Sequence, residues 1–336
     1  MKILVTGVAG FIGFHVAHKL IKKKYNVIGL DNLNNYYDQK LKLARLKELK
    51  KASKKNKNFK FFKIDICAEK KLKNLFIKNK FKKVLHFAAQ AGVRFSLKKP
   101  EQYIQSNLVG FFNILNLCKS HKISHLVYAS SSSVYGANKK IPFKESDGVN
   151  HPIQLYAATK RSNELMAHSY SALYKLPTTG IRFFTIYGPW GRPDMALYKF
   201  VKNILINKPI EIYNRGKHMR DFTYIDDAVN MIMKVLQKAP RQNKNNFKSD
   251  DPSKSFAPFN IINIGSNKPI TLINYIKKIE KITGRKAHKK YLNLQKGDII
   301  KTHANILKFN KIYSFTKKTN LNDGLKNFIN WYKKYN

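Results

Sequence analysis

The chain has 336 residues, 43% of them hydrophobic, which allows one large core or two smaller ones. The formal net charge is +46, but the 65 basic residues are spread along the whole chain without a nucleic-acid-binding motif, so biased base composition explains them more simply than a polyanion partner. No apolar run approaches the roughly 20 residues that cross a bilayer, the two cysteines make no disulfide framework, and the ten histidines show no metal-binding spacing. We therefore expect a reduced, cytoplasmic protein with no membrane, nucleic-acid or metal partner.

Short apolar segments alternate with segments of helical spacing through the first half of the chain. Strands are expected at residues 2–7, 26–32, 59–66, 83–89, 125–131 and 180–188, and helical spacing is clear at residues 11–23 and 101–119. This alternation is typical of right-handed βαβ units. It predicts an α/β protein with a Rossmann-type, doubly wound parallel sheet.

The pattern loosens after about Tyr187. Strand- and helix-like pieces continue at residues 210–214, 226–236, 259–265, 271–282 and 323–334, which suggests a smaller C-terminal α/β domain for substrate binding. We expect a first domain at residues 1–187 and a second mainly at 188–336, with some elements of the second returning to the first. Residues 240–258 are polar and contain Pro and Ser, so they are predicted to form an exposed loop.

The segment TGVAGFIG lies between the first predicted strand and the first predicted helix. Its glycines, Gly7, Gly10 and Gly13, would permit a tight turn, a close approach of the backbone to a pyrophosphate and close packing of helix on strand. The spacing departs by one residue from the usual dinucleotide pattern, and a plain tight turn is the alternative. Asp31 ends the second predicted strand, where a carboxylate can bind the adenosine ribose. The nearest arginine, Arg45, belongs to the next element, so the pattern favours NAD over NADP.

Four serines end the fifth predicted strand in SSSSVYG, residues 130–136. Further along, YAATK places Tyr156 and Lys160 four residues apart on one face of a helix. The spacing Y-x-x-x-K occurs six times in this lysine-rich chain. Only the pair at Tyr156 follows the glycine turn, the aspartate and the serine-ended strand in the order that a redox site requires.

At this point the chain resembles the extended short-chain dehydrogenase/reductase family, in particular its NAD-dependent nucleotide-sugar epimerases and dehydratases. The blocks that carry the resemblance are TGVAGFIG, HFAAQAGVR, SSSSVYG, YAATK, RFFTIYGPWGRPDMA and RDFTYIDD. The resemblance implies that Tyr156 is the catalytic base, that Lys160 lowers the pKa of Tyr156 and holds the nicotinamide ribose, and that Ser131 hydrogen-bonds the reacting hydroxyl. It also implies a homodimer formed through the helices at residues 101–119 and 156–174. The implied NAD site consists of Gly7, Gly10, Phe11, Ile12, Gly13, Asp31, Asp65, Ala88, Ala89, Tyr156 and Lys160.

The serine run distinguishes between reactions within this family. The dehydratases and the UDP-glucuronate decarboxylases typically carry glutamate just before the Val-Tyr pair, and the dehydratases carry aspartate before that. Here those places hold Ser133 and Ser132. A site without these carboxylates can oxidise and re-reduce C4 but is poorly equipped for elimination, which favours epimerisation.

The arginines indicate an acidic sugar. A guanidinium binds a carboxylate or a phosphate by paired hydrogen bonds. AAQAGVR and RFFTIYGPWGRPDMA closely resemble the UDP-glucuronate 4-epimerases, and Thr185 stands where UDP-galactose 4-epimerases typically carry Asn. The same resemblance implies that Arg220 contacts the UDP diphosphate and that Asp298 belongs to the block of residues on the uridine side. The expected substrate-binding residues are Arg94, Ser132, Ser133, Thr185, Arg192, Arg220 and Asp298.

These patterns favour an enzyme that interconverts UDP-glucuronate and UDP-galacturonate with bound NAD. Within the class, the alternative is a 4-epimerase of a neutral UDP-hexose or UDP-N-acetylhexosamine. From a different class, an inactive Rossmann scaffold or a polyanion-binding protein is the alternative. His86 is expected to support the site from a strand end rather than to catalyse, and Asn107 to bond across the interior of its helix near the site.

Overall fold

The computed structural model describes residues 1–243, 245, 251–315 and 318–336. These residues form two compact units, the first made of residues 1–138, 145–182 and 229–262, the second of residues 139–144, 183–228 and 263–336. The predicted loop at 240–258 belongs to the first unit, and its residues 244 and 246–250 lie outside the described residues. In the described part of the chain, no helix is both long and apolar enough to cross a bilayer.

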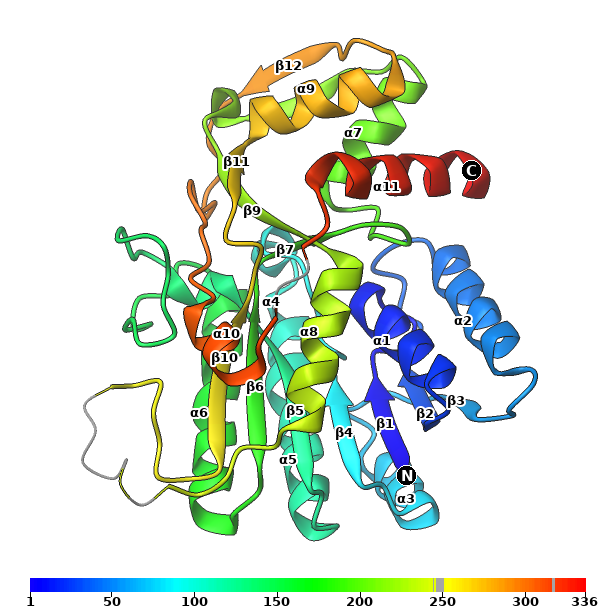
Figure 1. Cartoon of the computed structure of the whole chain (residues 1–336), viewed down its shortest axis with the longest axis vertical. Coiled ribbons are helices and arrows are strands. Elements are labelled where there is room, and N and C mark those ends of the chain that lie inside the picture. The colour runs from blue at the N-terminus through cyan, green and yellow to red at the C-terminus, as the bar shows by residue number, and fades with distance from the viewer. Residues whose placement is uncertain (244, 246–250, 316–317) are drawn as a thin grey trace. The chain divides into compact units, whose positions relative to one another are not determined.

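A seven-stranded sheet forms the frame of the first unit (Figure 1), and its strand order is β10-β6-β5-β4-β1-β2-β3. The recorded pairings between β3, β2, β1, β4 and β5 are all parallel. The strand order reverses between β1 and β4, which is the position where doubly wound sheets bind ligands. This confirms the predicted fold class. The strands are β1 (Lys2–Thr6), β2 (Asn26–Asp31), β3 (Phe59–Lys63), β4 (Lys83–His86), β5 (His125–Ser131), β6 (Thr178–Phe183) and β10 (Phe259–Ile264).

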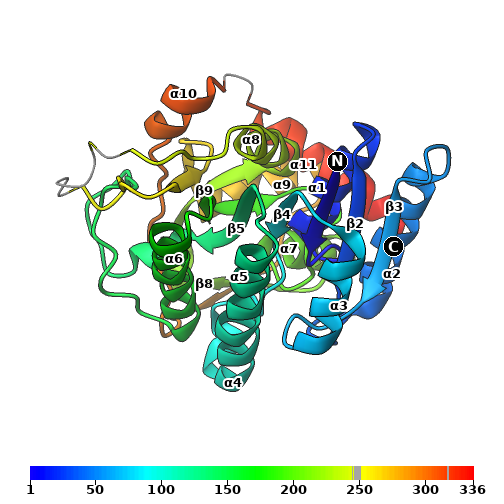
Figure 2. The same cartoon turned by 90° about the horizontal axis from the view of Figure 1, so that it is seen from below.

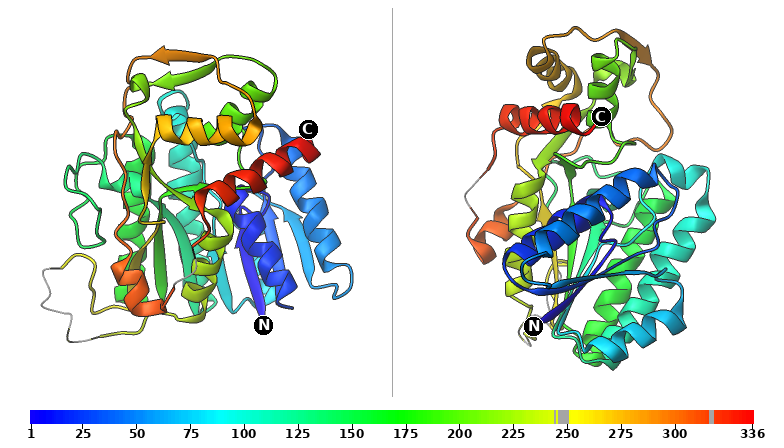
Figure 3. Two further views of the ribbon diagram at one scale, coloured as in Figure 1. Left: turned by 45° about the horizontal axis from the view of Figure 1, so that its top comes forward. Right: turned by 90° about the vertical axis from the view of Figure 1, so that its right-hand side faces the viewer.

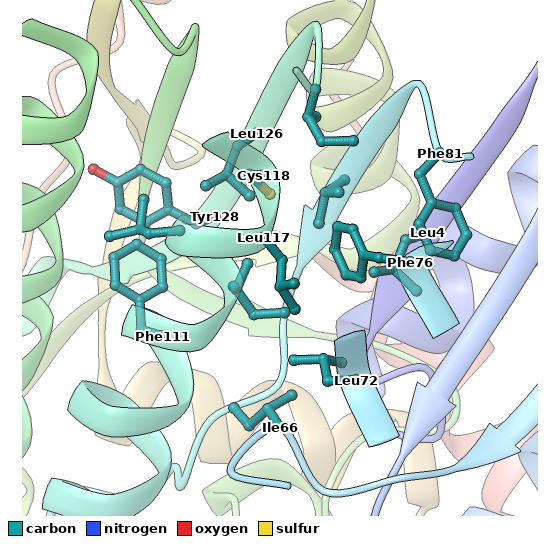
Figure 4. Close-up of a cluster of buried hydrophobic side chains, with 14 of the residues drawn as sticks. Leu4, Ile66, Leu72, Phe76, Phe81, Phe111, Leu117, Cys118, Leu126 and Tyr128 are labelled. Atoms are coloured by element: carbon teal, nitrogen blue, oxygen red, sulfur yellow. The ribbon is translucent and has the colours of Figure 1, made fainter. Parts of the chain in front are cut away.

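Helices cover both faces of this sheet (Figure 2). One face carries α1 (Phe11–Lys22), which packs on α2 (Gln39–Ser53), and α8 (Ile225–Gln237), whose residues from 229 on belong to the first unit. The other face carries α3 (Glu69–Asn79), α5 (Gly110–Ser120) and α6 (Leu155–Tyr174). Figure 4 shows the core on that side, where Leu4 and Leu126 of the sheet meet Phe76 of α3 and Phe111 of α5. Burial of these side chains holds the helices against the strands.

The helix predicted at residues 101–119 is interrupted. It consists of α4 (Pro100–Tyr103), a π-helical segment (Ile104–Val109) and α5. Within the π segment, Asn107 turns its side chain to the backbone of Gln90, accepting from the amide over 2.8 Å and donating to the carbonyl over 3.1 Å. Its Nδ2 also donates to Thr159 Oγ1 on α6 over 3.1 Å. Asn107 therefore bonds to the segment after β4 and to α6, and not across the interior of its own helix as expected. π-helical turns of this kind often occur at functional sites.

The strand predicted at residues 180–188 is in fact two strands. β6 ends at Phe183 in the large sheet, while β7 (Thr185–Tyr187) pairs in parallel with β9 (Met219–Tyr224) in the second unit. The single-strand prediction was wrong because both halves are apolar, and only their different pairing partners separate them. The first unit accordingly ends at residue 182 in this part of the chain.

The second unit contains two small sheets (Figure 3). β9 pairs with β7 and with β11 (Pro269–Thr271), and β8 (Ile210–Tyr213) pairs with β12 (Lys289–Leu292). The rings of Phe222 and Tyr275 stack with their centroids 4.0 Å apart in its core. Buried Asp221 ties two loops to β9, because its carboxylate accepts from the amides of Ser266, Asn267 and Ala304. The helices are α7 (Ala196–Leu205), α9 (Leu272–Thr283), α10 (Leu307–Tyr313) and α11 (Leu321–Tyr335).

Candidate active site

The turn between β1 and α1 leaves no room for a side chain at Gly7 or Gly13. Gly7 has a φ of +67°, and a Cβ atom there would lie 2.6 Å from the amide nitrogen of Ala88. A Cβ atom on Gly13 would lie 2.2 Å from the carbonyl oxygen of Gly7. The α1 helix begins at Phe11, with Gly10 as an N-cap residue that makes no side-chain cap. The amides at this helix start therefore face the space in front of the turn, as a pyrophosphate site requires.

Asp31 is held at the end of β2 next to this turn. Its Oδ2 accepts from the amide of Ala9 over 3.2 Å, and its Oδ1 accepts from the amide of Leu33 over 2.8 Å. Burial raises the pKa of Asp31, while the ammonium of Lys42 acts in the opposite direction.

Two cations of α2 lie close to Asp31, contrary to what the sequence suggested. The buried guanidinium of Arg45 donates from Nη1 to the carbonyl of Ala9 and to the hydroxyl of Tyr37, both over 2.7 Å. Lys42 Nζ donates to the Asn34 carbonyl over 2.8 Å. Arg45 belongs to the next element, as expected, but α2 folds back along α1 and brings both cations close to Asp31.

The carboxyl ends of β3 and β4 complete this edge. Asp65 Oδ2 accepts from Asn32 Nδ2 over 2.7 Å, which links the segment after β3 to the end of β2. Ala88 follows β4, and its amide donates to Thr6 Oγ1 over 3.1 Å. The glycine turn, Asp31 and Asp65 thus share one sheet edge. The close approach at Gly7 and Gly13 fits a dinucleotide, with Phe11, Ile12 and Ala89 in the same segments.

Three hydroxyls lie at the carboxyl end of β5 in a turn that we call the hydroxyl turn, made of Ser131, Ser132 and Ser133. Ser131 Oγ accepts from the amide of Ser133 over 3.1 Å and donates to Ser133 Oγ over 3.2 Å. A 3-10 turn (Ser132–Tyr135) continues from it. Ser130 points elsewhere, since its Oγ donates to the carboxylate of Glu164 over 2.7 Å.

The predicted base and its lysine lie at the start of α6. Lys160 is buried, and its Nζ donates to the carbonyl of Ala129 on β5 over 3.0 Å. Burial lowers the pKa of Lys160 to about 8. Tyr156 lies one helical turn earlier, with its ring edge-on to that of Tyr103 at 6.1 Å between centroids. The Lys160 contact places this face of α6 against β5 two residues before Ser131.

His86 stands at the end of β4 as a supporting residue. Its Nδ1 lies 2.8 Å from Thr6 Oγ1, and the side chain is buried. Burial, together with the charge of Lys160, lowers the pKa of His86 to about 3. The imidazole is therefore neutral near pH 7, as a packing residue would be. Among the described residues, no group of three or more His, Cys, Asp and Glu side chains is placed to hold a metal ion.

The predicted substrate residues fall in both units. Exposed Arg94 opens a 3-10 turn (Arg94–Leu97) of the first unit. In the second unit, Thr185 opens β7 and Arg220 lies on β9, where its Nη1 donates to the carbonyl of Ile300 over 2.9 Å. Asp298 lies 3.8 Å from the imidazole of His218.

Arg192 differs from the other candidates because a carboxylate already occupies its guanidinium. Its Nε and Nη2 donate to the two carboxylate oxygens of Asp194 over 2.9 and 2.7 Å. Both side chains are partly exposed, at 24% and 28%. Bidentate pairing of this kind is the geometry in which arginine binds a carboxylate ligand.

Sequence reasoning missed three of these charged residues. Lys42 and Glu164 are buried in the first unit, and Asp194 lies in the second. Glu164 offered a signal, since it follows Lys160 by one helical turn. Asp194 offered another, standing two residues after Arg192 in the block RPD.

The comparisons with known proteins identify the family. The model of the NAD dependent epimerase/dehydratase family matches residues 3–248. This chain belongs to that family. The recognised resemblance and the prediction of an NAD-dependent enzyme are thereby confirmed.

Three family relatives are similar along their whole length. Protein CapI of Staphylococcus aureus is 49% identical over 336 residues, which cover 100% of this chain and 99% of CapI. A probable UDP-glucuronate 4-epimerase of Rhizobium meliloti is 44% identical, covering 99% of this chain and 97% of the relative. The crystal structure of UDP-glucuronic acid 4-epimerase from Bacillus cereus, in complex with UDP-glucuronic acid and NAD, gives a TM-score of 0.88 at 32% identity and covers 100% of both chains.

Proposed function

We propose that this chain interconverts UDP-glucuronate and UDP-galacturonate by transient oxidation of the sugar at C4. The observation that carries the proposal is the hydroxyl turn, which presents Ser131, Ser132 and Ser133 and no carboxylate at the end of β5. Glu164 is close in space, but Arg182 and Ser130 bind its carboxylate. The turn can therefore bind and orient hydroxyl groups, and it lacks the acids that elimination needs.

The proposed catalytic residues act on one proton. The Tyr156 phenolate takes the proton of the C4 hydroxyl, and Ser131 hydrogen-bonds the same oxygen and holds it in place. The Lys160 ammonium lies in a buried site, where a nearby positive charge favours the phenolate strongly. Bound NAD would accept and return the C4 hydride, held by the glycine turn, Asp31, Asp65 and Lys160.

The second unit is proposed to bind the nucleotide sugar. Arg192 binds the C6 carboxylate of the sugar in the bidentate geometry that it now forms with Asp194. Arg220 binds the diphosphate, and Asp298 lies on the uridine side. Arg94, Thr185, Ser132 and Ser133 complete the contacts to the sugar.

An enzyme that oxidises the acidic sugar at C4 must fix the orientation of the C6 carboxylate. Oxidation at C4 gives a β-keto acid, which loses carbon dioxide when the carboxylate stands perpendicular to the ketone. Paired hydrogen bonds from a guanidinium fix the plane of a carboxylate. Arg192 is thus proposed to hold the carboxylate in an unproductive orientation as well as to bind it.

A proton NMR assay tests the proposal. The purified protein is incubated with UDP-glucuronate and NAD, and the sugar anomeric signals are followed with time. Appearance of UDP-galacturonate without UDP-pentose is expected. Formation of UDP-pentose as the main product would contradict the interpretation of the hydroxyl turn.

The neutral-sugar alternative has one observation in its favour, the occupation of Arg192 by Asp194. A closed pair presents no net charge to the sugar, as a UDP-hexose or UDP-N-acetylhexosamine site would require. The same NMR assay with UDP-glucose and UDP-N-acetylglucosamine separates the two functions. Faster conversion of either neutral substrate than of UDP-glucuronate would favour the alternative.

A homodimer through α5 and α6 is also proposed. The two helices are linked by a hydrogen bond of 2.7 Å from Tyr170 to Asn116, and they leave large apolar side chains exposed. Those side chains are Phe112, Leu165, Leu173 and Tyr174, and the π-helical segment before α5 adds Ile104 and Val109. Light scattering of the Leu165→Glu variant should give a monomer, whereas Leu307→Glu on α10, a site that is also exposed, should leave the dimer intact.

The cellular setting follows from the proposed chemistry. An enzyme that uses NAD and a UDP-sugar is proposed to work in the cytoplasm, where both are available, and without a nucleic-acid partner. Filter binding to random-sequence DNA at about 0.15 M salt tests the second point. Submicromolar binding there would contradict it.

A further inference from the structure

Glu164 and Arg182 form a buried ion pair that neither the cofactor site nor the proposed reaction uses. The carboxylate accepts from Nε and Nη2 of the guanidinium, each over 2.9 Å. The two side chains are 1% and 3% exposed. Burial by itself raises the pKa of Glu164, but the charge of Arg182 and the hydrogen bond from Ser130 outweigh it, so the pKa lies below its ordinary value. The carboxylate therefore stays ionised in the interior.

This pair contacts one residue on each side of the hydroxyl turn. On one side, Ser130, the residue before Ser131, donates its hydroxyl to Glu164 Oε1 over 2.7 Å. On the other side, the guanidinium carbon of Arg182 lies 4.8 Å from the ring centroid of Tyr135, which ends the 3-10 turn. Ser130 before the turn and Tyr135, two residues after it, thus both contact one ion pair.

The same pair fixes the helix that carries the proposed base. Tyr156, Lys160 and Glu164 stand at successive intervals of four residues in α6, so they project from one face of the helix. Lys160 bonds to Ala129 and Glu164 accepts from Ser130, two adjacent residues of β5. In the proposed reaction Lys160 also holds the nicotinamide ribose of bound NAD. Glu164 has no such second task and remains a constant attachment between α6 and β5.

We propose that Glu164, held by Arg182 and bonded to Ser130, is a positioning residue that sets the distance between the Tyr156 hydroxyl and the hydroxyl turn. The inference rests on the roles proposed above for Tyr156 and Ser131. Proton transfer needs heavy atoms within about 2.6–3.2 Å of each other. A misplacement of about 1 Å can cost about 100-fold in rate, so a link between these two segments affects turnover directly.

Ser130→Ala is the sharpest test, because it removes only the hydroxyl that joins β5 to Glu164 and leaves the ion pair in place. Ser162→Ala is the matched control, since Ser162 lies on the same helix and bonds only to the Ala158 carbonyl among the described contacts. Rates with UDP-glucuronate are measured per bound NAD, together with KM, the melting temperature and the reduction of bound NAD in a single turnover. Ser130→Thr keeps the hydroxyl and serves as the conservative variant.

We expect kcat of Ser130→Ala to fall about 10-fold with KM within about 2-fold, and the single-turnover reduction to slow equally. Ser130→Thr should recover most of the rate, and Ser162→Ala should match the wild type. If Ser130→Ala melts earlier but keeps its kcat per bound NAD, the pair has only a structural role and the inference is overturned.

Tyr156→Phe separates this outcome from a failure of the proposed function. If Tyr156→Phe is inactive and Ser130→Ala is unaffected, only the positioning role fails. If Tyr156→Phe keeps the wild-type rate, the proposed catalytic assignment fails as well.

Discussion

Arg192 and Asp194 face each other through two parallel hydrogen bonds of 2.9 and 2.7 Å. A sugar carboxylate that binds Arg192 in the same geometry competes with Asp194 for both donors. Partly exposed ion pairs contribute only about 0.2–1 kcal/mol, so the competition is mild and a dianionic or trianionic ligand can displace the aspartate.

Asp194→Asn should therefore strengthen binding of the acidic sugar. An amide competes less well than a carboxylate for the guanidinium, and KM for UDP-glucuronate should fall about 2- to 5-fold. The inhibition constant of UDP, which has no sugar carboxylate, should stay unchanged. Steady-state kinetics with UDP as competitive inhibitor measures both. A higher KM would mean that Asp194 orients Arg192 for the substrate instead of competing with it.

Arg192→Met should separate acidic from neutral substrates. Loss of two charge-assisted hydrogen bonds to a carboxylate should lower kcat/KM for UDP-glucuronate about 100-fold or more. Turnover of UDP-glucose, where detectable, should change less than about 3-fold. The NMR assay should also show a larger share of UDP-pentose, because the carboxylate of the keto acid is no longer held. Equal losses on both sugars would show that Arg192 supports the fold of its loop.

The sequence predicted those parts of this protein that depend on local chemistry. The strands of the large sheet are short apolar runs, and Gly7 and Gly13 occupy places where a Cβ atom would overlap the backbone. Hydrophobic periodicity and glycine spacing report such features directly. Tyr156 and Lys160 could be selected from six similar pairs only through their order relative to other blocks.

The features that the sequence did not predict depend on contacts between distant segments. Residues 180–188 read as one strand, and only the pairing of β7 with β9 divides them. Arg182 on β6 pairs with Glu164, which stands 18 residues earlier on another element. Lys42 and Arg45 reach Asp31 and Ala9 only because α2 packs back on α1. Such pairings depend on tertiary structure, and the hydrophobic periodicity of a sequence gives no information about which distant segments will meet.

Gly13→Ala should remove the cofactor and weaken the fold. The added methyl would lie 2.2 Å from the Gly7 carbonyl oxygen, so α1 must shift away from the glycine turn. Overpacking of this kind typically costs about 1–3 kcal/mol. Gly148→Ala is the control, because its Cβ would meet no heavy atom closer than 3.8 Å. Thermal melts and the NAD released on denaturation measure both effects. Wild-type NAD content in Gly13→Ala would rule out tight helix-to-turn packing as a requirement for binding.

Lys160→Met should stabilise the cofactor-free protein near neutral pH. Burial lowers the pKa of Lys160 from 10.5 to about 8, so the unfolded chain binds more protons than the folded protein between these values. The unfolding free energy of the wild type therefore rises with pH through that window, and below about pH 8 the buried ammonium costs about 3 kcal/mol. The variant also loses the hydrogen bond from Lys160 to Ala129, which lowers its unfolding free energy by about 1 kcal/mol.

Urea titrations of the cofactor-free protein from pH 7 to pH 10 measure this difference. Lys160→Met should be more stable than the wild type by about 2 kcal/mol at pH 7, with the gap closing as the pH rises toward 10. Lys47→Met, a change at an exposed lysine of α2, should show no such trend. A gap that stays constant with pH would mean that the folded protein does not disfavour the charged form of Lys160. In that case the ammonium would be solvated or paired, and its proposed influence on the Tyr156 phenolate would have to be weaker than burial suggests.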